Sequence, residues 1–233
     1  MDDTLALPAV PHRTDHAAAR AHMVDSQVRP NKVVDPRIIE AMRRLPRERF
    51  VPAGLSSLAY ADEDVPLPGG RALLEPMVIA RLAQILRVRP GETALVVGAG
   101  AGYGAAVLDA CGAKVTALED DAMLLALARA ALPALAPGVA LAEGPVAAGW
   151  ASGAPYDVIL IEGAVEAIPD VLVAQLKPGG RMATVLAGPN EPGMGVLAEP
   201  VQVGGETRMR SQPIFNCAVP ALPQFKRAPA FIF

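Results

Sequence analysis

Alternating glycine and alanine from Gly98 to Gly102 directly follow the apolar run Thr93–Val97. An apolar, β-branched run that breaks into glycines is typical of a buried strand ending in a tight loop. Residues 103–110 then show a helical pattern. Glycines let a backbone approach a ligand closely, and the free N–H groups of a helix N-terminus favour polar or anionic groups. This stretch therefore predicts a strand–loop–helix unit that binds a ligand.

An acidic residue follows this loop at a distance that suits recognition of a ribose. Glu119 lies 21 residues after Gly98, at the end of a second strand-like run over residues 114–118. A carboxylate about 20 residues beyond such glycines can accept hydrogen bonds from the ribose hydroxyls. The loop and the acid together indicate a nucleoside-containing cofactor, and they favour a cofactor-dependent enzyme.

The glycine spacing separates two classes of cofactor. The dinucleotide pattern G-x-G-x-x-G fails when counted from Gly98, because its last position is Tyr103. Counted from Gly100, it passes only with a final alanine. Methyltransferases that bind S-adenosylmethionine use the spacing G-x-G-x-G, since no pyrophosphate has to be held. The spacing therefore favours S-adenosylmethionine, with NAD and a glycine-rich turn without a ligand as the alternatives.

From residue 91 onward, strand-like and helix-like segments alternate. The expected strands are residues 93–97, 114–118, 138–142, 157–161 and 181–186, and the expected helices are 103–110, 121–132 and 166–176. Alternation of this kind predicts a Rossmann-like, doubly wound α/β fold with a mostly parallel sheet. Its ligand should lie beyond the carboxyl ends of the strands. Two later apolar runs, 196–203 and 213–219, predict a closing antiparallel pair.

The part of the chain before residue 91 follows a different pattern. Asp35-Pro36 suits a helix N-cap followed by proline, and Pro46 ends the helical spacing of apolar residues. A second apolar stripe with helical spacing runs over residues 78–86. We expect a flexible N-terminus at residues 1–20, an N-terminal helical region that borders the substrate at 21–90, and a cofactor-binding domain at 91–233.

Composition and charge argue against several classes of protein. The net charge is −3, so no basic surplus points to nucleic acid. The sequence contains no signal peptide and no apolar stretch of ~20 residues, so we expect no membrane span. The only cysteines, Cys111 and Cys217, suit a reducing cytoplasm. All three histidines precede residue 23, which argues against a Ser-His-Asp triad or a histidine-rich metal site in the main domain.

The N-terminal half carries segments that resemble one enzyme family. These segments are Met23–Arg29, Asp35–Met42, Leu45–Pro52 and Ala59–Asp62. They are similar to the opening of the protein-L-isoaspartate O-methyltransferase family, in which the Pro-Arg-Glu-x-Phe-Val-Pro signature (residues 46–52) is fairly specific. The similarity covers roughly residues 20–220 and continues through Gly98–Leu108, Gly149-Trp150, Ala154–Asp157 and Leu176–Gly180.

The resemblance implies an S-adenosylmethionine-dependent carboxyl O-methyltransferase that repairs isoaspartyl residues in proteins. Isoaspartyl proteins or peptides would be its substrates, and the methyl ester would collapse to a succinimide that reopens partly to aspartate. A carboxylate with a pKa near ~3.9 is ionised at neutral pH and is its own nucleophile. The reaction therefore needs no general base, which agrees with a main domain that lacks histidine.

The candidate site residues come from the loop, the strand ends and the resemblance. Glu162 directly follows the fourth expected strand, where its carboxylate could act near the methyl donor or remain solvated. The cofactor-binding candidates are Gly98, Ala99, Gly100, Gly102, Tyr103, Glu119, Gly144 and Glu162. No catalytic residue and no metal ligand is assigned.

Residues 70–77 depart from the family pattern at the lip of the substrate site. They align without gaps to the family's G-Q-T-I-S-Q-P-x, so Leu74 stands where the family has a serine that serves the substrate carboxylate. Leucine cannot donate a hydrogen bond, and Glu75 would repel a carboxylate if it faced the site. Arg71 replaces a glutamine and is predicted to pair with Glu75 or with a substrate carboxylate. Arg71, Leu74 and Glu75 are therefore the candidates for the substrate lip.

Two further departures affect the cofactor side. Val96 replaces an acidic residue before the glycine loop, and Pro145 replaces the aspartate that would accept from the adenine amino group. Losing such an acceptor typically costs ~1–3 kcal/mol. Two alternatives to repair therefore stay open. One is a methyltransferase with another acceptor, and the other is a non-catalytic protein that binds a nucleoside ligand.

Overall fold

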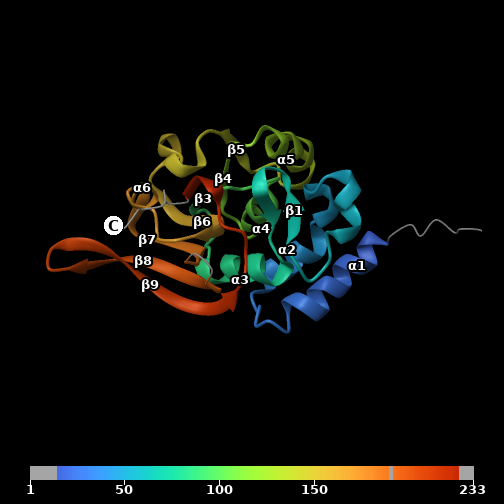
Figure 1. Ribbon diagram of the computed structural model, residues 1–233, viewed down its shortest axis with the longest axis horizontal. Coiled ribbons are helices and arrows are strands. Elements are labelled where there is room, and N and C mark those ends of the chain that lie inside the picture. The colour runs from blue at the N-terminus through green and yellow to red at the C-terminus, as the bar shows by residue number, and fades with distance from the viewer. Residues whose placement is uncertain (1–14, 189–190, 226–233) are drawn as a thin grey trace, which may run out of the picture.

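The computed structural model describes residues 15–188 and 191–225, and a seven-stranded sheet forms its centre (Figure 1). The strand order is β5-β4-β3-β6-β7-β8-β9. The five strands from β5 to β7 pair in parallel, whereas β8 and β9 are antiparallel. The bounds are β3 (Thr93–Val97), β4 (Lys114–Glu119), β5 (Ala140–Glu143), β6 (Tyr156–Val165), β7 (Leu176–Leu186), β8 (Gly193–Val203) and β9 (Glu206–Cys217).

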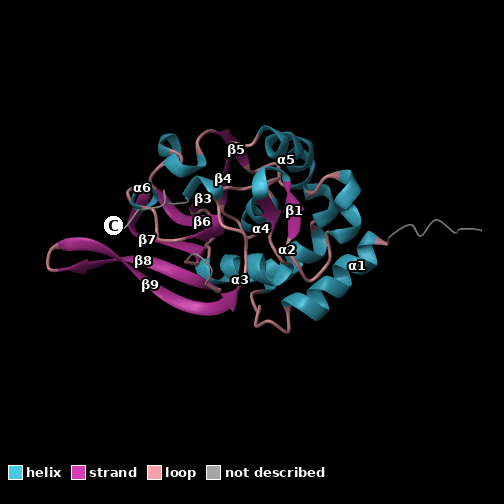
Figure 2. Cartoon of the chain, viewed as in Figure 1, coloured by secondary structure: helices cyan, strands magenta, loops and turns pink. Residues whose placement is uncertain are grey.

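Six α-helices accompany the sheet in the described part of the chain. They are α1 (His16–Met23), α2 (Pro36–Arg44), α3 (Pro76–Leu86), α4 (Tyr103–Ala110), α5 (Ala122–Leu135) and α6 (Asp170–Val173). Three of these helices have an aspartate N-cap whose side chain accepts hydrogen bonds from backbone N–H groups: Asp15 caps α1, Asp35 caps α2 and Asp121 caps α5. The helices α1 and α2 lie at the opposite end of the molecule from the projecting β8–β9 hairpin (Figure 2).

The parallel strands are buried on both faces, which explains their continuous apolar runs. Along β3, Ala94 and Val96 belong to a large core that also holds α3 and α4, while Leu95 and Val97 face a second, smaller core. Val96 is fully buried. The valine that replaces the family's acidic residue is therefore a packing residue in this chain.

The predicted fold class is confirmed: the sheet is mostly parallel, ends in an antiparallel pair and carries a helical N-terminal extension. The expected limits of β3 and α4 agree with the structure to the residue. The helix expected at 166–176 is reduced to α6 (Asp170–Val173), because β6 continues to Val165 and β7 begins at Leu176.

The N-terminal region contains more order than the sequence indicates. Residues 16–20, expected within a flexible N-terminus, belong to α1, and residues 1–14 lie outside the described part. The turn-rich link before α3 contains a short antiparallel hairpin of β1 (Val65–Leu67) and β2 (Arg71–Leu73). Within residues 15–188 and 191–225, no helix is both long and apolar enough to cross a bilayer.

Candidate functional site

Three of the candidate residues lie on or directly after the neighbouring parallel strands β3, β4 and β6. Val97 at the end of β3 pairs with Leu118 on β4 and with Ile161 on β6. Gly98, Glu119 and Glu162 each come directly after one of these paired residues, so they lie on adjacent strands at the same level of the sheet. The chain leaves β3 towards β4 on one side and returns to β6 on the other. A crevice at such a switch point is where open α/β sheets bind their ligands.

The glycine loop has a backbone conformation that requires glycine. Gly98 has φ 67° and Gly102, the residue that precedes α4, has φ 94°. Other residues rarely adopt this left-handed region. Within the loop, the N–H of Ala99 donates to the carbonyl of Leu118 at 3.0 Å, which ties the loop to the end of β4. The loop is thus held in a fixed shape beside Glu119.

Glu119 lies at the centre of a dense hydrogen-bond network. Its side chain is fully buried. Oε2 accepts from the N–H of Gly100 at 2.7 Å, and Oε1 accepts from the N–H groups of Asp120 at 3.0 Å and Asp121 at 3.1 Å. Oε1 also forms an ion pair with Nη1 of Arg71 at 3.1 Å. Glu119, which is predicted to bind the ribose, is therefore held in a fixed position by other groups of the chain.

The predicted pairing of Arg71 with Glu75 is wrong, because Arg71 pairs with Glu119. Its Nη2 also donates a hydrogen bond to the carbonyl of Gly98. The strand β2 directs this side chain towards the ends of β3 and β4. Glu75 instead lies near Asp62 and Asp64, and its pKa is raised by burial and by these two charges.

Leu74 packs in the hydrophobic core and is not a residue that could hydrogen-bond a substrate. Its side chain is 2% exposed and belongs to the main hydrophobic core. Its carbonyl accepts a hydrogen bond from Nη2 of Arg47. The residue that corresponds to the family's serine is therefore a structural residue here.

Arg47 connects the signature motif to the site, a role that sequence reasoning missed. The side chain is fully buried, and its Nε donates to the carbonyl of Ala59 at 2.6 Å. Its guanidinium lies 4.9 Å from the centre of the Tyr103 ring, and Tyr103 packs edge-on against Phe50. A buried cation over an aromatic ring is favourable. The only signal for this role in the sequence is the Pro-Arg-Glu motif at residues 46–48.

Glu162 is buried without a full set of partners. It is 6% exposed, and its Oε1 has no hydrogen-bond partner. A Cβ on Gly104 would lie only 2.1 Å from this oxygen, so the glycine in the first turn of α4 makes room for the carboxyl. Burial raises the pKa of Glu162 to about 8; the nearby Glu119 charge adds to this, while Arg71 and Arg47 oppose it. The group is therefore mainly protonated at neutral pH.

The loop after β5 lies beside the acid at the end of β4. The N–H of Gly144 donates to the carbonyl of Glu119 at 3.1 Å. The following 3-10 segment η5 (Val146–Ala148) begins with an N–H that donates to Oδ2 of Asp120 at 3.2 Å. Asp120, which was not predicted, thus contacts the residue after Pro145, the position at which the sequence departs from the family pattern.

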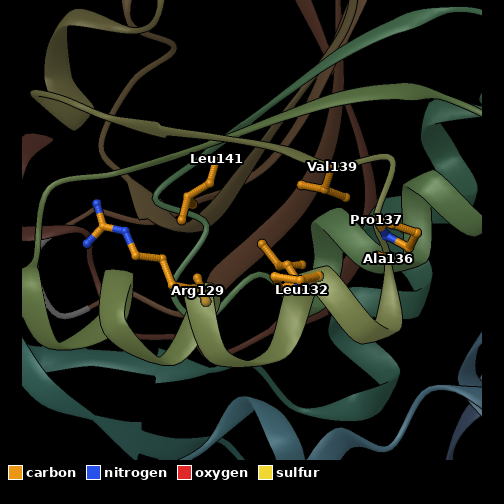
Figure 3. Close-up of a pocket in the computed structure, with 8 residues that line it drawn as sticks. Arg129, Leu132, Ala136, Pro137, Val139 and Leu141 are labelled. Carbon is orange, nitrogen blue, oxygen red and sulfur yellow. The ribbon is translucent and has the colours of Figure 1, made fainter.

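A separate apolar hollow of about 320 Å³ lies between α5 and β5 (Figure 3). Leu132, Val139 and Leu141 line it together with Arg129. The segment 136–139 places it at the amino-terminal end of β5, whereas Glu119 lies at the carboxyl end of the neighbouring strand β4. This hollow is therefore not the crevice predicted from the glycine loop.

Comparison with known proteins places these features in a family. The family model described as protein-L-isoaspartate(D-aspartate) O-methyltransferase matches residues 18–191. The chain belongs to this family. A protein-L-isoaspartate O-methyltransferase of Methylorubrum extorquens (strain PA1) is 43% identical over 175 residues, which cover 75% of this chain and 77% of the relative. That of Koribacter versatilis (strain Ellin345) is 39% identical over 184 residues, 78% of this chain and 83% of the relative.

Solved structures of the family share the fold. A protein-L-isoaspartate O-methyltransferase structure superposes with a TM-score of 0.70 at 20% identity, over 89% of this chain and 65% of that chain. A structure from Plasmodium falciparum, a putative member in complex with S-adenosyl-L-homocysteine, gives a TM-score of 0.68 at 17% identity, over 90% and 98% of the two chains. The resemblance stated from the sequence is confirmed.

This chain has a glycine loop and a buried carboxylate that are suited to an adenosyl cofactor. From Gly98 to Gly102 the glycine loop carries no side chain larger than a methyl group, and the buried Glu119 carboxylate lies beside it. These residues fit S-adenosylmethionine chemically. Among the candidate residues, Gly98, Ala99, Gly100 and Gly102 form the loop, Tyr103 begins α4, Glu119 ends β4, Gly144 follows β5 and Glu162 lies within β6.

Proposed function

We propose that this protein is an S-adenosylmethionine-dependent carboxyl O-methyltransferase that acts on isoaspartyl residues of proteins and peptides. The observation that carries the proposal is the buried Glu119 carboxylate beside the glycine loop at the switch point of the sheet. Its membership in the protein-L-isoaspartate O-methyltransferase family supports the substrate class.

The residues of this chain would mainly position the reactants. When bound, S-adenosylmethionine supplies a methyl group activated by a sulfonium. Glu119 would accept hydrogen bonds from the ribose hydroxyls, and the loop from Gly98 to Gly102 would lie against the amino-acid part. The acceptor carboxylate needs no deprotonation at neutral pH, because its pKa lies near ~3.9. Alignment alone can contribute ~7–11 kcal/mol to such a reaction.

We place the reaction in the cytoplasm, and the two cysteines agree with this. Neither Cys111 nor Cys217 forms a disulfide. Burial raises the pKa of each thiol to about 11, so both are largely protonated at neutral pH and are poor nucleophiles.

A methyl-transfer assay tests the proposal. Labelled S-adenosylmethionine is incubated with the protein and either an isoaspartyl peptide or its aspartyl twin of the same sequence. We expect base-labile label on the isoaspartyl peptide alone, because a carboxyl methyl ester hydrolyses in base. Equal labelling of both peptides, or no labelling of either by a protein that binds the cofactor, would contradict the substrate assignment.

The lip of the site supports a second candidate, a methyltransferase with another acceptor. Leu74 offers no hydroxyl, and Glu75 lies with Asp62 and Asp64 near the same segment. In their ionised form, the carboxylates of Glu75, Asp62 and Asp64 would repel an incoming carboxylate and favour a neutral or cationic acceptor. Transfer to a neutral or cationic acceptor with none to the isoaspartyl peptide would favour this candidate.

We expect Leu74→Ser to lower the free energy of unfolding by about 2–4 kcal/mol, because it removes a buried side chain and buries a hydroxyl. Urea unfolding measures the change. Leu58→Ser is the matched control, because Leu58 is 41% exposed, and we expect it to cost less than about 1 kcal/mol. Unchanged stability of Leu74→Ser would show that Leu74 is not a core residue.

The same variant also tests the substrate. A gain in isoaspartyl transfer by Leu74→Ser would show that the native chain has moved away from that substrate.

A further inference from the structure

The acceptor sites of Glu119 are already occupied by groups of the chain. A carboxylate offers about four acceptor positions. Glu119 uses them for three backbone N–H groups and for Nη1 of Arg71. The side chains of Arg71 and Glu119 are 3% and 0% exposed. A ribose that binds to this carboxylate must therefore compete with the guanidinium of Arg71.

The same guanidinium also covers the first glycine of the loop. Nη2 of Arg71 donates to the carbonyl of Gly98. A Cβ built on Gly98 would lie 2.7 Å from this nitrogen. Arg71 thus occupies the space in front of the bare backbone that would approach the cofactor, as well as the carboxylate that would bind the sugar.

The C-terminal segment covers the crevice from the other side. Residues 220–225 lie along the end of β6: Ala164 donates its N–H to the carbonyl of Pro220 at 3.0 Å and accepts from the N–H of Leu222 at 2.9 Å. The Leu222 side chain is 2% exposed, and its Cδ2 would lie 3.2 Å from a Cβ on Gly98. In Figure 1 this red segment runs beside β3 and β6.

The end of this segment reaches the acid next to Glu119. Nε2 of Gln224 donates to Oδ1 of Asp120 at 2.9 Å. Gln224 lies in the 3-10 segment η7 (Pro223–Phe225), which contacts η5 (Val146–Ala148) after β5. The sugar-binding carboxylate, the first glycine and the region after β5 are therefore all covered by the chain itself.

We propose that Arg71 and residues 220–225 close the cofactor crevice in the resting protein, and that an S-adenosyl ligand binds only to an open form, in which Arg71 has left Glu119 and residues 220–225 have left β6. This inference rests on the proposed function. A ligand that binds a minor open state shows an affinity reduced by the population of that state. An open population of about 1–10% weakens the apparent affinity about 10–100-fold. Arg71 therefore sets the affinity for the cofactor.

Calorimetry with S-adenosylhomocysteine tests the inference on three full-length proteins: the wild type, Arg71→Gln and Arg210→Gln. Glutamine removes the charge that competes for Glu119. We expect Arg71→Gln to bind at least about tenfold more tightly than the wild type. Arg210→Gln makes the same charge change in an exposed pair with Glu199 on the β8–β9 hairpin, and should bind like the wild type.

A second measurement on the wild type covers the case in which Arg71→Gln does not fold. The N–H of Leu222 is bonded to the carbonyl of Ala164, so its hydrogen exchange is slow while the segment is closed. We expect millimolar S-adenosylhomocysteine to speed exchange at Leu222. Unchanged or slower exchange would overturn the inference.

The binding outcomes separate this inference from the proposed function. Equal affinity of the wild type and Arg71→Gln overturns the closed crevice and leaves the proposed function intact. Failure of all three proteins to bind S-adenosylhomocysteine overturns both. Tighter binding by Arg71→Gln, with Arg210→Gln unchanged and Leu222 exchanging faster, supports both the closed crevice and the cofactor assignment.

Discussion

Glu119→Ala should lower the free energy of unfolding by about 3–5 kcal/mol, because breaking a buried ion pair leaves an uncompensated charge. The guanidinium of Arg71 is 3% exposed and would keep only the Gly98 carbonyl as a partner. The N–H groups of Gly100, Asp120 and Asp121 would also lose their acceptor. Urea unfolding at neutral pH measures the effect.

Two control variants show whether the loss of stability comes from the buried Arg71–Glu119 pair. Glu199→Ala removes a partner of the exposed Arg210, and such surface pairs contribute about 0–1 kcal/mol. The double variant Arg71→Gln/Glu119→Ala removes the stranded charge, so it should be more stable than Glu119→Ala alone. A cost of less than about 1 kcal/mol for Glu119→Ala would contradict the buried pair.

Glu162→Gln should abolish a loss of stability that the wild type suffers as the pH rises. Burial raises the pKa of Glu162 from 4.5 to about 8. Between these values the folded protein keeps a proton that the unfolded chain has released. The unfolding free energy therefore falls by about 1.4 kcal/mol per pH unit, and this penalty is fully present above pH 8.

The difference between the two proteins isolates this group from others that titrate. We expect Glu162→Gln to gain about 3 kcal/mol over the wild type between about pH 5 and 7.5. Urea unfolding at several pH values gives the slope. Glu143→Gln is the control, because its side chain is 63% exposed and should not alter the slope. A difference between Glu162→Gln and the wild type that stays constant over this range would show that Glu162 is ionised when buried.

The central part of the fold could be predicted because its signals are local. The apolar run of β3 and the glycines after it lie within ten residues, and their order alone identifies a strand, a loop and the start of α4. Burial on both faces of the parallel strands makes such runs continuous. The expected helix at 166–176 was too long because the extensions of β6 and β7 depend on pairing with each other.

The partners within the site could not be predicted because they are distant in the sequence. Arg71 and Glu119 are 48 residues apart, and Gln224 and Asp120 are 104 apart. The first pair depends on the direction of β2, and the second on the return of the C-terminal segment over β6. Residue types alone made Glu75 an equally reasonable partner for Arg71. Only the fold shows that Arg71 reaches Glu119.

A crystal structure of the protein with S-adenosylhomocysteine would examine the cofactor crevice most directly. We expect density for the adenosyl group over residues 97–103, the ribose hydroxyls on the Glu119 carboxylate, and Arg71 moved away from its present partner. Density at another place, or a crevice in which Arg71 still holds Glu119 at saturating ligand, would contradict the account.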